Sequence, residues 1–493
     1  MGNRPPLLDI TALPHKGRSF LLNEDVSAGD VVLRTKPYAA IPDCGSRTFV
    51  CAHCLKPPKI THQEQSHSAS PERERQPLPV SCVTCCVASY CTSTCADRDF
   101  LKFHRFECAF LAELGATTKN DDDGALTEYE RDYLWLLVRV LIGRAWEVKG
   151  EEHDVKDDTS AREAEETMRF EDVWALCSNA SSFSAEAVKR FHVVAGHLLH
   201  FVQGHLLPGF KFPSDVEDSL LWAPETQDVP NPKSPPPNAA ASNSPQHSAL
   251  YKSLLTLICK EECNSFGLYT FAYQGPTVPR QGYALALYPR AVFFNHSCLP
   301  NVGHITNTCL ESSAGTVKAS GGQEKMVDYT ELIFYATRDI KRGDEAVISY
   351  IELDEADTDA AGDGEGRSAV ERRRMALNDM FFFKCACVRC EFEADATTPP
   401  RTLTDLSALL CRKDGCRGRF MPSALAGSHE PEPATEGTKG GLTKASPAIT
   451  EDPSPARTDS AKDLRLKTAH ARKHGPSRQT WTCEACGRIR QNA

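Results

Sequence analysis

The chain of 493 residues contains 21 cysteines, and most of them stand in pairs or clusters at short spacings. Thiolates are zinc ligands, and closely spaced cysteine pairs are typical of structural zinc sites. The chain begins without the apolar core of a secretory signal, which predicts a reducing compartment where thiols stay free. Clustered cysteines in such a compartment indicate metal binding rather than disulfides.

The first cluster supplies eight ligands, enough for two closed tetrahedral zinc sites. They are Cys51, Cys54, Cys82, Cys85, Cys91, Cys95, His104 and Cys108. The longest interval holds 27 residues, and closing it costs on the order of 1 kcal/mol more than closing a loop of about ten residues. A structural zinc ion contributes roughly 10–16 kcal/mol in small peptides, so metal binding outweighs this cost. Cys86 could replace Cys85, although Cys85 keeps the two-residue gap.

The second cluster has three thiols, at Cys385, Cys387 and Cys390, and needs a fourth ligand to close a tetrahedron. We expect Cys298 to supply it. This cysteine lies in the string NHSCLPN at Asn295–Asn301, whose Pro-Asn end predicts a tight turn. The first Asn and the His of the string offer polar groups for a ligand.

The third cluster pairs Cys411 and Cys416 with Cys483 and Cys486. Two thiols on each of two short knuckles predict a zinc clip that closes a long loop. Six further cysteines are expected to pack in the interior as small apolar side chains. They are Cys44, Cys86, Cys177, Cys259, Cys263 and Cys309.

The segments between the clusters must position these ligands, and their hydrophobic patterns predict an α+β fold with helices inserted between early and late strands. Residues 19–41 alternate around a turn at 28–30, which predicts a β-hairpin. A second hairpin is predicted from 331–337 and 346–350 around a turn at 341–344. Helices are predicted over 127–146, where Thr127 and Glu130 form a capping box, and over 170–177, 185–203 and 250–263.

Three polar, proline-rich stretches cannot bury enough apolar surface to offset chain entropy and are predicted to be mostly disordered. They cover 57–81, 223–248 and 422–479, and a shorter acidic insert covers 354–365. The net charge of 56 − 66 = −10 gives no basic balance that would favour nucleic acid. The longest apolar stretch, 133–146, is interrupted by Arg139 and Arg144 and is too short to cross a bilayer.

The spacing of the first cluster and the pair Tyr90–Cys91 resemble a MYND finger. That resemblance implies interleaved ligands, with one zinc ion on Cys51, Cys54, Cys91 and Cys95. The second ion would lie on Cys82, Cys85, His104 and Cys108. Modules of this kind usually contact proteins, which implies proline-containing peptide partners and no direct nucleic-acid binding.

Five motifs in family order make the chain similar to SET and MYND domain-containing (SMYD-type) protein-lysine methyltransferases. They are Lys16-Gly17-Arg18, the finger, Cys263-Asn264-Ser265-Phe266, Asn295–Asn301, and Gly343–Tyr350 followed by the second cysteine cluster. The resemblance implies a β-rich SET core that is split by the finger and a helical insert and is followed by a post-SET zinc site. The implied boundaries are 15–50 and 263–353 for the two parts of the SET core, 51–108 for the finger, 109–262 for the helical insert with its linker, 354–392 for the acidic insert and post-SET region, and 403–493 for the C-terminal region with the zinc clip.

The implied activity is methyl transfer from S-adenosyl-L-methionine to a lysine of a histone or another basic protein. The cofactor-binding residues carried over by motif are Gly17, Arg18, Asn264, Asn295, His296, Tyr350 and Phe383. Tyr350 would orient the amine and polarise the methyl group, Phe266 would line the lysine channel, and Phe381 would influence the methylation state. Three zinc ions are expected, and the C-terminal clip would hold a fourth.

Two residues depart from the family pattern. Ser19 stands where a second glycine is usual, which disfavours a close approach of that loop to the cofactor. Phe381 stands where tyrosine is frequent, which predicts that higher methylation states are accessible. The residues after Cys486 are too few for the helical-repeat domain of many family members.

A second hypothesis is a catalytically inactive adaptor whose finger recruits protein partners in transcriptional regulation. Ser19 favours this hypothesis, whereas Tyr350, Asn295 and His296 argue against a decayed site. A zinc-based DNA binder is the weakest alternative, because the finger has no broad basic stripe. The sequence predicts a nuclear or cytoplasmic protein that is neither secreted nor inserted in a membrane.

Overall fold

The computed structural model describes residues 6–56, 76–116, 125–149, 168–206, 245–269, 282–306, 329–351, 353, 367–394, 420–422, 480–483 and 489–491. This part of the chain contains both helices and strands, as the hydrophobic patterns predict. The predicted connectors at 57–81, 223–248 and 422–479 and the acidic insert at 354–365 lie wholly or mainly outside the described residues.

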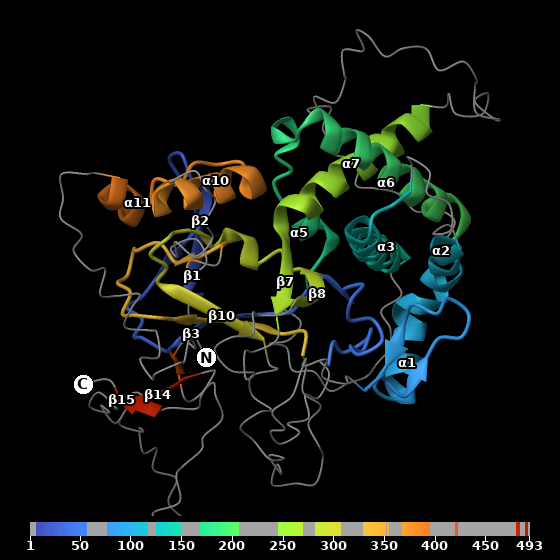
Figure 1. Cartoon of the computed structure of the whole chain (residues 1–493), viewed down its shortest axis with the longest axis horizontal. Helices are drawn as coiled ribbons and strands as arrows, with labels where there is room; N and C mark the ends of the chain where they lie inside the picture. Colours follow the sequence, from blue (N-terminus) through green and yellow to red (C-terminus); the bar gives the residue numbers. More distant parts are fainter. Residues whose placement is uncertain are drawn as a thin grey trace, which may run out of the picture.

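Strands that are early in the sequence pair with strands that are late in it (Figure 1). One antiparallel sheet has the order β10 (Val302–Thr306), β11 (Leu332–Ala336), β3 (Val31–Thr35), and a second has the order β4 (Ala39–Pro42), β8 (Gly282–Leu287), β7 (Ser265–Tyr269). A hairpin joins β1 (Leu8–Leu13) to β2 (Gly17–Leu22), and β9 (Asn295–His296) runs parallel to β12 (Val347–Ile348). The two three-stranded sheets therefore each need strands from the beginning and from the later part of the chain.

Both predicted hairpins are wrong, although their turns form. Asp30 N donates to Ser27 O at 3.0 Å, but β2 pairs with β1, and β3 pairs with β11. Asp344 N likewise donates to Lys341 O at 3.0 Å, but β12 pairs with β9. The physical reason is that distant strands cover the edges that each predicted hairpin would have used.

The predicted helices are present, with ends shifted by a few residues. They are α3 (Glu128–Lys149), α5 (Phe170–Trp174), α6 (Ala185–Gly204) and α7 (Pro245–Asn264). The capping box of α3 is confirmed, because Thr127 N donates to Glu130 Oε2 at 2.7 Å and Glu130 N donates to Thr127 Oγ1 at 3.2 Å. Two further helices flank the second cysteine cluster, α10 (Ala369–Phe381) and α11 (Val388–Ala394).

The first cysteine cluster lies in a small compact unit at the right of Figure 1. Its elements are the hairpin of β5 (Val80–Ser81) and β6 (Ser89–Tyr90), the helix α1 (Ser93–Asp99), a π-helical turn η1 (Phe100–His104) and the helix α2 (Arg105–Ala116). The side-chain oxygen of Thr92 caps α1 by accepting from Cys95 N at 3.1 Å. This cap fixes the backbone next to a predicted zinc ligand.

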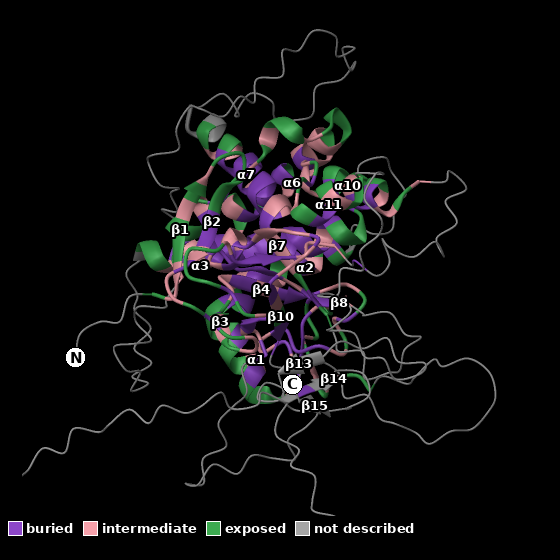
Figure 2. Cartoon of the chain, turned by 90° about the vertical axis from the view of Figure 1, so that its left-hand side faces the viewer, coloured by how far each residue is buried: buried purple, intermediate pink, exposed green. Residues whose placement is uncertain are grey.

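The helix α3 is the centre of the larger hydrophobic core. Residues 132–142 are buried all round the helix, and α6 and α7 pack against it. Figure 2 shows buried residues continuing from the helices into β7 and β8. Among the helices that the structure describes, none combines the length and the apolar character needed to cross a membrane.

Arg139 lies within this buried stretch of α3 and joins three parts of the molecule. Its guanidinium forms ion pairs with Asp99 at 2.9 Å and with Glu107 at 2.8 Å, both from the cysteine-rich unit. It also donates to the carbonyl oxygens of Ala40 on β4 at 3.1 Å and of Ala52 at 2.8 Å. Burial alone would raise the pKa of Asp99, but Arg139 holds that pKa below its ordinary value.

We expect Arg139→Met to lower the free energy of unfolding by about 3–5 kcal/mol, because Asp99 and Glu107 then keep buried charges without their cation. Lys189→Met is the matched control, since Lys189 and its partner Glu186 are both exposed on α6 and the loss should be less than about 1 kcal/mol. Urea denaturation followed by tryptophan fluorescence measures both variants. Equal losses would contradict a central role for Arg139.

Candidate functional site

Twelve sulfur and nitrogen donors gather into three sets of four, and within each set the ligand atoms lie within 4.8 Å of one another. The sets are Cys51, Cys54, Cys91 and Cys95; Cys82, Cys85, His104 and Cys108; and Cys298, Cys385, Cys387 and Cys390. These are the groupings that the cysteine spacing and the finger resemblance predict. Metal binding by each set stays a prediction.

The separations within the sets suit zinc. Neighbouring sulfur atoms within the sets lie 3.5 to 3.9 Å apart. Four thiolates at about 2.3 Å from a zinc ion lie about 3.8 Å from one another when they form a regular tetrahedron. The donors are thus already arranged as a tetrahedral ion would need them, and their chemistry, thiolate with one imidazole, is that of closed structural zinc sites.

Two cysteines that were expected to be buried are exposed, so that prediction is wrong for Cys86 and Cys177. Cys86 lies at a turn with φ of 57°, and its thiol donates to Val83 O at 3.6 Å. It is not part of the second set, where Cys85 takes the place predicted by the two-residue gap. Cys259 is buried as expected, whereas Cys309 lies outside the described residues.

The Lys16–Arg18 motif leads from the turn of the first hairpin into β2, and its Gly17 has φ of 72°. Only glycine adopts this backbone without strain, which accounts for the glycine of the motif. Asn295 fastens the turn: its amide nitrogen donates to Lys16 O at 3.3 Å and to Ser19 Oγ at 2.5 Å. Ser19 is fully buried, so the residue that departs from the family pattern contributes a hydrogen bond to this site.

Glu345 completes this polar group, and the sequence analysis did not single it out. One carboxylate oxygen accepts from the Asn295 amide at 3.1 Å, and the other pairs with Lys16 Nζ at 2.6 Å. Asn301 holds the same segment from the other side, because its amide donates to Glu345 O and accepts from Val347 N, both at 2.8 Å. Only its place in the Gly343–Tyr350 motif could have pointed to Glu345.

His296 lies between Cys298, which belongs to the third donor set, and Tyr350. Its Nδ1 accepts from Tyr350 N at 3.0 Å, and its Nε2 faces Cys298 Sγ at 3.2 Å. A neutral imidazole that accepts at Nδ1 carries its proton on Nε2, so this nitrogen donates to the sulfur. The imidazole thereby connects a predicted zinc ligand to the backbone of the predicted catalytic tyrosine.

Tyr350 is surrounded by aromatic rings. Its ring centroid lies 5.0 Å from that of Phe381, 6.3 Å from that of Phe383 and 5.4 Å from that of His296. Its hydroxyl donates to Phe294 O at 2.8 Å. Burial raises the pKa of Tyr350 above its ordinary value, so the hydroxyl stays protonated at neutral pH.

Phe266 belongs to a second aromatic group. Its ring contacts Tyr288 at 5.7 Å and His304 at 6.5 Å, and it packs with Tyr350 against one hydrophobic cluster. Phe266 on β7 and Tyr350, which follows β12, are the two residues predicted to surround the acceptor lysine, and both pack against this cluster.

Asn264 and Arg18 both bind the short loop that follows α5. The Asn264 amide nitrogen donates to Cys177 O at 2.8 Å and to Lys260 O at 2.7 Å. Arg18 donates to Ala175 O at 2.6 Å, and its guanidinium lies 4.9 Å from the ring centroid of Phe293. The amide nitrogen of Asn264 is therefore committed within the protein. Its side-chain oxygen accepts a weaker hydrogen bond from the Cys177 thiol at 3.8 Å, so this oxygen is the atom better suited to a ligand.

A sequence model of the SET domain family matches residues 22–351 of the chain, which is more than half of its length. The chain belongs to the SET domain family. The match begins at the end of β2 and ends directly after Tyr350. It therefore contains Asn264, Asn295, His296 and both three-stranded sheets of early and late strands, β10-β11-β3 and β4-β8-β7. The SET fold of mixed helices and strands is thereby confirmed.

The curated relatives include proteins that are named for SET and MYND domains. A SET and MYND domain-containing protein of Dictyostelium discoideum is 22% identical over 80% of this chain and 61% of its own length. A second from that organism is 21% identical over 85% and 90%, and the human histone-lysine N-methyltransferase SMYD3 is 22% identical over 78% and 62%. The resemblance to SMYD-type proteins is confirmed, and the chain spans less than two thirds of the first and third of these relatives.

Among solved structures, the SET domain of LSMT bound to lysine and AdoHcy aligns with 70% of this chain and 50% of that chain at 10% identity. The TM-score is 0.21, which is too low to support a comparison of sites.

The predicted C-terminal zinc clip lies beyond the SET match. Cys411, Cys416 and Cys486 are outside the described residues, and Cys483 is the last residue of β14 (Thr480–Cys483). This strand lies between β13 (Phe420–Pro422) and β15 (Ile489–Gln491) in an antiparallel sheet. Segments on the two sides of the long loop do meet, while the metal set itself stays a prediction.

We expect Cys298→Ser to lower the zinc content by one equivalent per chain, because the three remaining thiols do not close a tetrahedron. Cys259→Ser is the control, since this thiol is also buried but belongs to none of the three donor sets. Atomic emission after exhaustive dialysis measures the content. Fewer than three equivalents in the wild type, or no change in Cys298→Ser, would contradict the assignment.

Proposed function

We propose that the protein is an S-adenosyl-L-methionine-dependent protein-lysine N-methyltransferase of the SMYD type. The observation that carries the proposal is the environment of Tyr350 at the end of the SET match, where its ring lies among aromatic rings and its hydroxyl donates to Phe294 O. Relatives named as lysine methyltransferases support the same activity. A histone or another basic protein is the proposed substrate, and the excess of acidic residues suits such a partner.

The residues present fit the proposed cofactor in kind. Polar groups for its amino-acid end are the Asn264 side-chain oxygen and the backbone at Asn295 and His296, and the ring of Phe383 suits stacking on adenine. Gly17 and Arg18 would border the site from the first hairpin. When bound, S-adenosylmethionine supplies a methyl group activated by a sulfonium cation.

The chain's own residues would prepare the acceptor lysine. A free lysine has a pKa of about 10.4, and entry between Phe266 and Tyr350 removes water, which favours the uncharged amine. The Tyr350 hydroxyl donates to Phe294 O, so its oxygen can accept an N–H of the amine and aim the nitrogen lone pair. No strong general base is required at this site.

The three cysteine sets would hold zinc ions with structural roles. The first two make up the proposed MYND finger, and the third makes the proposed post-SET site. Because His296 joins Cys298 to Tyr350 N, we expect the third ion to hold the catalytic tyrosine in place.

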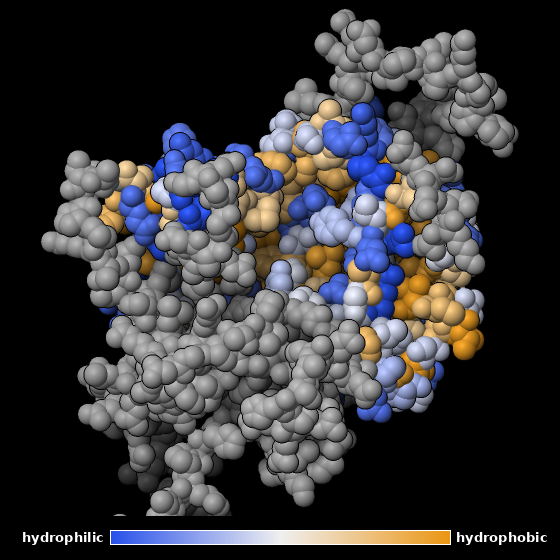
Figure 3. Space-filling view, viewed as in Figure 1, coloured by the Kyte–Doolittle hydropathy of each residue, from blue (hydrophilic) through white to orange (hydrophobic). Residues whose placement is uncertain are grey.

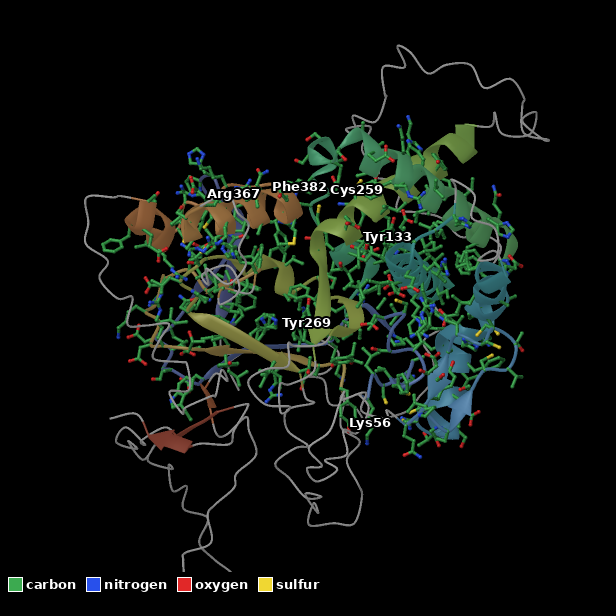
Figure 4. The ribbon with its side chains drawn as sticks, in the orientation of Figure 1. Lys56, Tyr133, Cys259, Tyr269, Arg367 and Phe382 are labelled. Carbon is green, nitrogen blue, oxygen red and sulfur yellow. The ribbon has the colours of Figure 1, made fainter. Side chains whose placement is uncertain are left out.

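The finger also offers a surface for protein partners. Phe100 and Leu101 on η1 are each about half exposed, at 52% and 50%, and Figure 3 shows apolar side chains on the side of the molecule where α1 and α2 lie. Exposed apolar side chains of this kind favour contact with proline-containing peptides. This partner class is part of the proposal.

We expect Tyr350→Phe to bind S-adenosylmethionine as the wild type does and to lose methyl transfer by at least about 100-fold, the scale for removing one group that orients the transition state. Isothermal titration measures cofactor binding, and transfer of a labelled methyl group to histones measures activity. The control is Tyr129→Phe, which removes a hydroxyl bonded to Glu262 on the helical side of the molecule.

Two outcomes would count against the enzyme. If the wild type shows no cofactor binding at millimolar concentration, the adaptor hypothesis replaces it. If Tyr350→Phe and Tyr129→Phe retain equal activity, Tyr350 has no catalytic role.

We expect the wild type to form di- or trimethyllysine and Phe381→Tyr to shift the product towards monomethyllysine. The rings of Phe381 and Tyr350 lie 5.0 Å apart, so a new hydroxyl would reach the same space and restrict a methylated amine. Mass spectrometry of a peptide after exhaustive turnover measures the product. A wild-type protein that forms only monomethyllysine would contradict the proposal that Phe381 makes higher methylation states accessible.

A further inference from the structure

A fourth set of metal-type ligands lies on the surface between α2 and the end of α6, outside the three cysteine sets. It consists of Glu113 on α2, His200 on α6 and His205 at the C-terminal cap of α6. His200 Nε2 lies 3.1 Å from Glu113 Oε2, and His205 Nε2 lies 3.5 Å from the same oxygen. All three ligand atoms lie within 4.8 Å of one another.

These separations are those of ligands around one small cation. Imidazole nitrogen and carboxylate oxygen bind zinc at about 2.0–2.2 Å, so two such ligands on a tetrahedral ion lie about 3.4 Å apart. Both imidazoles present the same nitrogen, Nε2, to the same oxygen. Two histidines and one carboxylate are also the donor set of open zinc sites that keep a position for water.

Buried aromatic rings hold both imidazoles in place. Phe110 lies one helical turn before Glu113, and its ring contacts His200 at 6.3 Å and His205 at 5.8 Å. The ring of Phe201 stacks on His205 with an interplanar angle of 12°. Phe110 and Phe201 are 1% and 0% exposed, so the core of the molecule fixes the orientation of the ligands.

The set is open to solvent. The side chains of His200 and Glu113 are 60% and 53% exposed, and that of His205 is 16% exposed. An ion could therefore enter from solution and complete its coordination with water. A plain surface ion pair between these groups would add little to stability, whereas a shared cation would fasten α2 to α6 (Figure 1).

We infer that Glu113, His200 and His205 bind a divalent transition-metal ion, with zinc as the natural choice because imidazole and carboxylate ligands suit it. Water fills the remaining positions. The ion links α2 of the cysteine-rich unit to the C-terminal end of α6, so its role is to stabilise this contact rather than to take part in methyl transfer.

The test uses the full chain with its thiol sites loaded with zinc and dialysed to a constant content. Titration with Zn²⁺ by calorimetry should show one further equivalent, and the melting temperature should rise with added Zn²⁺ because the ion binds the folded state. Glu113→Gln and His200→Gln should each weaken this equivalent at least about tenfold and remove the rise. Both residues are exposed, so folding should be unaffected, which the unchanged zinc content of the thiol sites verifies.

His197→Gln is the matched control, because His197 lies on α6 one turn before His200 and is not in the set. It should keep the further equivalent. Absence of that equivalent in the wild type, its persistence in Glu113→Gln, or its loss in His197→Gln would each overturn the inference. Since none of these readouts measures methyl transfer, the result is independent of the proposed function.

Discussion

The ion pairs and hydrogen bonds of the buried Arg139 guanidinium are the interaction on which the arrangement of helices, strands and cysteine-rich unit depends. It lies inside the core helix α3 and meets carboxylates from the cysteine-rich unit and a carbonyl oxygen from a SET strand. Asp99 also accepts a hydrogen bond from Tyr90 at 3.0 Å, directly before the predicted ligand Cys91. One cation thus fixes the position of the cysteine-rich unit against both the helices and the strands, and an apolar residue could not satisfy the same acceptors.

A second chain of contacts lies in the later part of the SET match. There β9 lies parallel to β12, and this pairing sets His296 beside Tyr350. The imidazole then continues to the sulfur of Cys298. The third cysteine set therefore contacts the candidate site as well as joining segments of the chain, because the His296 ring links Cys298 to the backbone of Tyr350.

The sequence allowed good prediction wherever the determining signal is local. The capping box of Thr127 and Glu130, the helices and the grouping of the cysteines all follow from residues a few positions apart or from a family spacing. The hairpins at 19–41 and 331–350 were wrong because alternation identifies a strand but not its partner. Ser19 and Glu345 lie beside or within motifs of the resemblance, but they meet around Asn295 only through contacts between distant segments, which no spacing in the sequence could show.

The pairing of β3 with β11 has a consequence for the order in which the protein forms during synthesis. Thr35 lies opposite Leu332, so β3 leaves the ribosome long before its partner strand β11 has been synthesised. The cysteine-rich unit, whose donors all lie within residues 51–108, can fold first, while β3 and β4 still have unpaired edges. Contacts of such large sequence separation form slowly, so the proposed methyl-transfer site would be the last part of the SET domain to form. Until then, the unpaired edges of the early strands are open to aggregation or to a chaperone.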